Sequence, residues 1–111
     1  MKENATFEEL VSAAGSGDLP DGWIYRPRDG GDVLADKYAV TTSDEDIELD
    51  LVKVGGDDVV RVLHEAGLRP WIDSATFEDV VSSREAKTGK RDLQDIAAAV
   101  EYYLENDDFM D

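Results

Sequence analysis

The sequence contains no cysteine, and that absence alone excludes several kinds of chemistry. Without thiols the chain forms no disulfide, no zinc-thiolate site and no cysteine nucleophile. Histidine occurs once, as His64, within a stretch of helical periodicity, where a histidine is most often a surface or half-buried residue. A catalytic relay or an imidazole metal site would depend on this single ring. We therefore expect neither a resident metal nor a cofactor.

The sequence motifs of common enzymes are also missing. No GxxxxGK[ST], GxGxxG, HExxH or GxSxG pattern occurs along the chain. Carboxylates are so numerous that any pair of them could be assigned as acid and base. Such a pair becomes catalytic only when its surroundings separate the two pKa values, which requires a cleft. We predict that the protein is not an enzyme.

Basic residues are scarce. The chain has 11 Lys and Arg against 17 Asp and 10 Glu, so its net charge is −16. Binding of nucleic acid needs a basic surface, and anionic membranes repel an acidic one, so neither is expected as a direct partner. The charge favours a basic protein partner. The excess of Asp over Glu fits adaptation to high salt as well, and in that case the acidity has no partner.

Long apolar runs are absent too. The first 15 residues lack the apolar core of a signal peptide, and no stretch is long enough to span a membrane. The expected location is the cytoplasm. A length of 111 residues suits one domain, residues 1–111.

Apolar spacing and capping residues predict four helices. They begin after Thr6, at Asp57 or Asp58, at Thr76 and after Asp92. The first is expected to end at Gly15 or Gly17, the second at Gly67, and the third within the basic stretch 84–91. Their predicted inward faces comprise Phe7, Leu10, Val11 and Ala14; Val59, Val62, Leu63 and Ala66; Phe77, Val80 and Val81; and Leu93, Ile96, Ala97, Val100, Tyr103 and Leu104.

Three strands are predicted, at residues 23–25, 37–41 and 47–53. The first two would form an antiparallel hairpin, and residues 70–72 are expected to be a connector. In the third, Ile47, Leu49 and Leu51 would face the core. These elements predict a compact single-domain α+β fold, with a small antiparallel sheet of about three strands packed with about four helices.

Two helix starts are similar, because TFEELVS at 6–12 and TFEDVVS at 76–82 share five of seven residues. A duplicated unit is one explanation. Independent amphipathic helix starts are the other, and we favour this one because the sequences diverge directly after the match.

Carboxylates are densest between Asp44 and Asp50, where five of seven residues are acidic. The run fails as a calcium loop, since Leu49 stands where a glycine is needed and Gly55 where a bidentate glutamate belongs. In a strand, Glu48 and Asp50 would face solvent together, about 7 Å apart, close to the spacing of nucleic-acid phosphates. A second acidic cluster ends the chain, at Glu101, Glu105, Asp107, Asp108 and Asp111. For each of the two acidic clusters, the alternative is that its carboxylates form solvated surface and bind no partner. The basic residues of stretches 26–28 and 84–91 are expected to balance acidic neighbours locally.

Two segments resemble a group of short acidic bacterial immunity-type proteins, which neutralise toxins. These are the N-terminal TFEELVS segment and the C-terminal YYLENDDF segment at residues 102–109. The resemblance implies a non-enzymatic antitoxin that binds a cognate toxin in the cytoplasm. A basic nuclease toxin agrees with the charge of the chain.

The expected mechanism is occlusion of a basic toxin cleft by the acidic clusters and an exposed tyrosine. Two alternatives stay open: an inhibitor of a host nuclease that mimics nucleic acid, and a salt-adapted acidic domain without a charge-directed partner. The candidate partner-binding residues are Asp44, Glu45, Asp46, Glu48, Asp50, Tyr102, Asp107 and Asp108.

Overall fold

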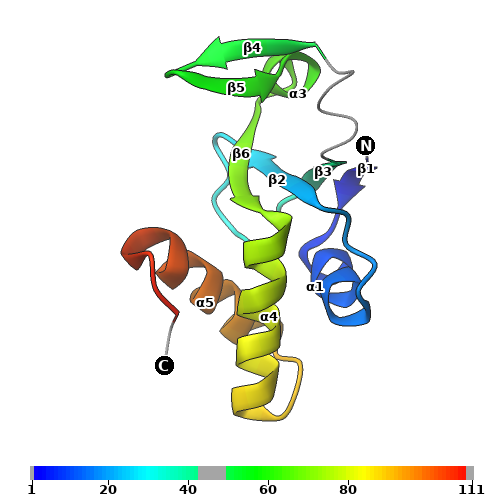
Figure 1. Cartoon of the computed structure of the whole chain (residues 1–111), viewed down its shortest axis with the longest axis vertical. Coiled ribbons are helices and arrows are strands. Elements are labelled where there is room, and N and C mark those ends of the chain that lie inside the picture. Colours follow the sequence, from blue (N-terminus) through cyan, green and yellow to red (C-terminus); the bar gives the residue numbers. More distant parts are fainter. Residues whose placement is uncertain (1, 43–49, 110–111) are drawn as a thin grey trace.

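A four-stranded antiparallel sheet forms the centre of the molecule (Figure 1). The computed structural model describes residues 2–42 and 50–109. In the sheet the strands lie in the order β1-β3-β2-β6, so the two outer strands flank the predicted hairpin. The strands are β1 (Lys2–Ala5), β3 (Tyr38–Thr42), β2 (Gly22–Pro27) and β6 (Leu68–Asp73).

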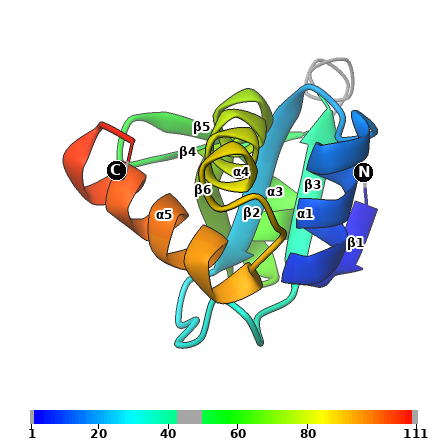
Figure 2. The ribbon, with the colours of Figure 1, turned by 90° about the horizontal axis from the view of Figure 1, so that it is seen from below.

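Three helices lie together on one side of this sheet (Figure 2). They are α1 (Phe7–Ser16), α4 (Ser74–Thr88) and α5 (Leu93–Asn106). Their apolar faces meet Ile24, Val40 and Ile72 of the sheet in the main core. This layer contains the predicted inward positions of α1 and α4, all of which are buried.

A smaller layer covers the opposite side of the sheet (Figure 1). It consists of the hairpin β4 (Leu51–Val54) and β5 (Asp57–Val60), followed by the short helix α3 (Arg61–Glu65). Val59, Val60 and Leu63 pack there against Tyr25 and Ala39. Neighbours along a strand point to opposite faces, so β2 and β3 each contribute to both cores.

The predicted α+β class is confirmed, and so are the caps of the first and last helices. Thr6 and Glu9 form a reciprocal capping box, with Thr6 Oγ1 accepting from the Glu9 amide at 3.1 Å. Gly17 ends α1 in the left-handed conformation. Asp92 caps α5 by accepting from the amides of Gln94 and Asp95.

The helix predicted from Asp57 or Asp58 is wrong. Both residues belong to β5, α3 begins only at Arg61, and Val62 is exposed rather than inward. The cause is the Gly55-Gly56 pair, whose φ angles of 60° and 91° turn the chain back on itself. Two adjacent residues with positive φ form the tight turn that favours a hairpin. That turn brings Lys53 opposite Asp58.

Several other boundaries differ from prediction. Residues 70–72 belong to β6 rather than to a connector, and Pro70 is tolerated because β6 is an edge strand. Strand β4 begins at Leu51, which is exposed, while residues 47–49 of the predicted strand lie outside the described residues. Asp73 caps α4, which therefore begins two residues before Thr76. Strand β1 was not predicted, and the larger sheet has four strands rather than three.

The two similar helix starts meet in the main core. The rings of Phe7 and Phe77 pack edge to face, with their centroids 6.0 Å apart. Thr6 caps its helix from outside, whereas Thr76 lies within α4 and donates its hydroxyl to Asp73. The matching letters thus have different structural roles, which favours independent helix starts.

Two arginines are buried and paired with carboxylates. Arg26 Nε donates to Asp36 at 2.9 Å, and its guanidinium lies 5.5 Å from the centre of the Trp71 ring. Arg84 donates through two nitrogens to both carboxylate oxygens of Asp95, joining α4 to α5. These hydrogen bonds lower the pKa of the Asp95 carboxyl. No helix in the described part of the chain is long and apolar enough to cross a membrane.

Gly22→Ala is expected to destabilise the protein by about 1–3 kcal/mol, because the added methyl group would overlap the backbone of the neighbouring strand. The nearest atom to a Cβ at Gly22 is the carbonyl oxygen of Thr41. Gly15→Ala is the matched control. There the new atom meets the far ends of two long side chains, Arg91 and Glu85, rather than backbone, so a change within about 0.5 kcal/mol is expected. Urea denaturation of both variants measures the difference, and equal stabilities would contradict the assignment of close packing to Gly22.

Candidate functional site

The C-terminal end of α5 carries the candidate residues that the structure brings together. Glu101, Tyr102 and Glu105 are exposed, while Val100 on the other side of the helix is completely buried. Asp107 ends the helix in the left-handed conformation, and Asp108 accepts a hydrogen bond from the Phe109 amide at 2.8 Å. We call this region, Glu101 to Phe109, the α5 tip.

The charge at the α5 tip is locally unfavourable. A helix has a partial negative charge at its C-terminal end, where basic side chains stabilise it and acidic ones do the opposite. The last turn of α5 has no basic residue, yet Glu105 lies in it and Asp107 and Asp108 follow directly. The carboxylates of the α5 tip therefore repel the helix end as well as one another.

Apolar side chains are exposed among these carboxylates. The side chains of Tyr102 and Phe109 are 41% and 42% exposed, and that of Leu104 is also exposed. The inward position predicted for Leu104 is therefore wrong. The ring of Phe109 is fixed against Tyr103, with the centroids 5.2 Å apart. The sequence analysis did not predict that Leu104 and Phe109 are exposed. Both residues are apolar, and nothing in the sequence indicated that they lie outside the core.

The remaining candidates lie elsewhere. Asp44, Glu45, Asp46 and Glu48 lie outside the described residues. Asp50 precedes β4 and accepts from Arg61 Nε at 2.7 Å, so its charge is balanced within the chain. Figure 1 shows the β4–β5 hairpin at one end of the long axis, well separated from the C-terminal end of α5. Asp50 and the α5 tip therefore do not form one continuous site.

Three arginines of the two basic stretches have acidic partners, and Arg26 pairs with Asp36 rather than with Asp29 or Asp32. Arg84 binds Asp95, and Arg91 lies 3.3 Å from Glu85. His64 is half-buried, and its Nδ1 lies 3.4 Å from a guanidinium nitrogen of Arg28. Within residues 2–42 and 50–109, no group of three His, Asp or Glu side chains is placed to hold a metal ion.

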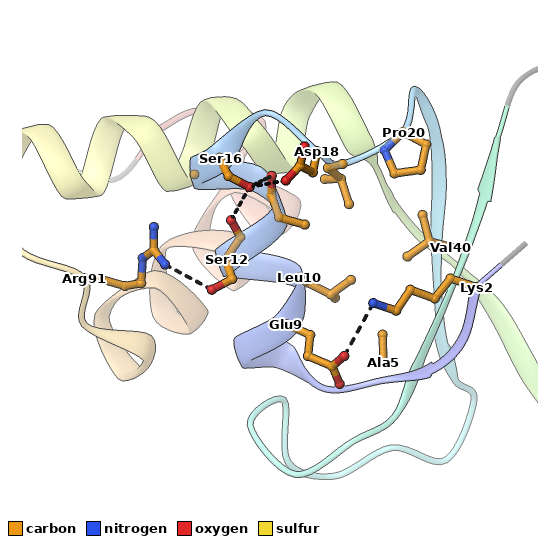
Figure 3. Close-up of a pocket in the computed structure, with 13 residues that line it drawn as sticks. Lys2, Ala5, Glu9, Leu10, Ser12, Ser16, Asp18, Pro20, Val40 and Arg91 are labelled. Atoms are coloured by element: carbon orange, nitrogen blue, oxygen red, sulfur yellow. Dashed lines mark hydrogen bonds and ion pairs between the residues drawn. The ribbon is translucent and has the colours of Figure 1, made fainter.

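A pocket of about 550 Å³ lies beside α1 (Figure 3). Its floor is apolar, and its rim consists of polar groups that bind one another. Lys2 contacts Glu9, Arg91 donates to Ser12, and Ser16 donates to Asp18. Because these groups already satisfy each other, the pocket offers little to orient a polar ligand, and we assign it no function.

Asp107→Gly is expected to stabilise the protein by about 0.5–1 kcal/mol, because glycine adopts positive φ without a Cβ penalty and removes a negative charge from the helix end. The φ of Asp107 is 54°. Asp107→Asn removes the charge alone and should give about 0.3–1 kcal/mol. Chemical denaturation at low salt measures both. Destabilisation by both variants would contradict an unfavourable charge at the α5 tip.

The comparisons with known proteins identify a family and no function. No curated protein and no solved structure matches the chain. Residues 6–111 match the family described as Domain of unknown function (DUF7716), a span that contains both the first helix start and the α5 tip. The chain therefore belongs to the DUF7716 family.

Proposed function

We propose that this protein is a non-enzymatic immunity-type protein, which binds a basic toxin domain and blocks its substrate-binding surface. The observation that carries the proposal is the α5 tip, where carboxylates gather at a helix end whose last turn has no basic residue, next in sequence to exposed apolar side chains. Such a surface costs stability in the free protein. A cationic partner would remove the repulsion, and the exposed rings would supply the contact area on which binding energy concentrates.

The net charge supports a nuclease as the target. Nucleases bind a polyanion through a basic groove, and an acidic inhibitor is steered to such a groove by long-range attraction. The acidic run at residues 44–50 is a second candidate contact in this proposal, with Asp50 as its described end. The competing assignment is an inhibitor of a host nuclease that mimics nucleic acid, which would use the same surface against a different enzyme.

The test begins with capture of a basic protein from the source cell by the tagged chain. The captured protein is then purified, and its enzymatic activity is measured with increasing amounts of the chain. Tyr102→Ala is expected to weaken inhibition by about tenfold or more, the loss typical of an aromatic hot-spot residue. Asp107→Asn with Asp108→Asn should slow association and reduce its salt dependence.

The control for the charge variant is Glu8→Gln with Asp79→Asn, which removes two exposed carboxylates from other helices. It should inhibit as the native chain does. A captured protein whose activity is unaffected by the chain, or equal inhibition by all these variants, would refute the proposal. The identity of the inhibited enzyme decides between a cognate toxin and a host nuclease.

Salt dependence of folding separates the proposal from salt adaptation. Many described carboxylates already have local partners, including those at Glu9, Asp36, Asp95 and the helix cap Asp92. We expect the protein to stay folded in dilute buffer and to gain stability gradually as salt screens the remaining repulsion. Circular dichroism across a salt series measures this. If the protein instead unfolds in dilute buffer and refolds in molar salt, its acidity is an adaptation to high salt rather than to a basic partner.

A further inference from the structure

A groove opens on the side of the sheet that faces the β4–β5 hairpin. It has a volume of about 530 Å³, and its lining joins the sheet to the hairpin. The sheet contributes Trp23 and Tyr25 of β2 and Pro70 of β6, and the hairpin contributes Leu51, Asp57, Asp58 and Val60. We call it the Trp23 groove. It is distinct from the α5 tip, which belongs to the helical layer on the other side of the sheet (Figures 1 and 2).

Trp23 leaves a large aromatic surface open to solvent at this groove. Its side chain points to the same face of β2 as Tyr25, because residues two apart on a strand share a face. Tyr25 is buried in the small core and its hydroxyl accepts from the Val60 amide at 3.1 Å. Trp23, in contrast, is 43% exposed. Trp23 therefore presents an exposed indole face at the lining of the groove, next to the anchored ring of Tyr25.

The acidic residues of the groove are incompletely neutralised. Asp58 holds the ammonium group of Lys53 at 2.8 Å, and this contact raises the pKa of Lys53. Asp57, which lies next to Asp58 on β5, forms no ion pair within 4 Å among the described residues, although the charge of Lys53 also acts on it. The groove thus combines an aromatic plane with two carboxylates that share a single nearby cation, Lys53.

The molecule contains a completed example of this chemistry on its other tryptophan. There the guanidinium of Arg26 lies over the Trp71 ring, and Asp36 accepts a hydrogen bond from the same guanidinium. A planar cation between an indole and a carboxylate is favourable, because the ring face attracts the charge while the carboxylate accepts its N–H groups. The Trp23 groove has the indole and the carboxylates, but the described residues supply no guanidinium to it.

We propose that the Trp23 groove binds an arginine side chain of the basic partner, with the guanidinium stacked on Trp23 and hydrogen-bonded to Asp57 or Asp58. This inference rests on the proposed function for its source of the arginine. The groove binds by its own chemistry, however, and a short arginine peptide can therefore be used to test it. The partner would then contact the chain through the Trp23 groove as well as through the α5 tip.

The test is a titration of the intact chain with a capped tri-arginine peptide, followed by NMR of the two indole N–H groups. Trp23 and Trp71 are the only tryptophans, and Trp71 is buried. The Trp23 signal should shift on binding, whereas the Trp71 signal should stay in place and report an intact core. A tri-lysine peptide should bind more weakly at Trp23, because ammonium groups cannot stack as a planar guanidinium does.

Two double variants, which each remove two negative charges, test the carboxylates of the groove. Asp57→Asn with Asp58→Asn should weaken the peptide affinity measured at Trp23 by about two- to fivefold, as expected for an exposed cation–π and carboxylate site. Glu65→Gln with Asp79→Asn removes two exposed carboxylates outside the groove and should have a smaller effect. Absence of a Trp23 shift, or equal weakening by both pairs, would overturn the groove as an arginine site.

The two proposals fail separately. If the toxin is inhibited through Tyr102 but the peptide leaves Trp23 unshifted, the groove proposal is overturned and the proposed function stands. If the peptide shifts Trp23 through Asp57 and Asp58 but no basic enzyme is inhibited, the proposed function is overturned and the arginine site stands.

Discussion

The alternation of side chains along β2 and β3 is the constraint on which the rest of the structure depends. Ile24 and Val40 face the helices, whereas Tyr25 and Ala39 face the hairpin, and all four are buried. A sheet that is apolar on both faces must be covered on both. The helical layer and the hairpin layer are the two coverings, and each candidate binding surface arises where one of them leaves side chains exposed.

The strongest local signals in the sequence were sufficient to predict most of the helical layer. Thr6 and Glu9 form the capping box that their spacing indicates, and Asp92 caps the last helix. These signals are reliable because the interacting groups lie within three residues of one another. The β2–β3 hairpin followed from aromatic and β-branched residues on either side of a glycine-rich loop.

The second layer was not predictable in the same way. Val59, Val62 and Leu63 have helical spacing, yet the positive φ angles of Gly55 and Gly56 commit residues 57–60 to a strand. Strand β6 contains Pro70, which local rules place in a loop, and its position at the sheet edge is a tertiary property. The Trp23 groove depends on both of these elements, and so the sequence alone could not indicate it. The α5 tip could be proposed because its residues are consecutive.

The order of the elements has a consequence for substitutions in the hairpin layer. The hairpin and α3 are inserted between β3 and β6, and their cluster meets the sheet mainly through Tyr25, Ala39 and Leu68. Substitutions in residues 51–67 therefore affect the main core through few side chains. The helices on the other face of the sheet continue to pack against β2 and β3. The exposed residues of the hairpin layer can therefore change what this side of the molecule recognises without disturbing the main core, provided that Val59, Val60 and Leu63 still cover Tyr25 and Ala39.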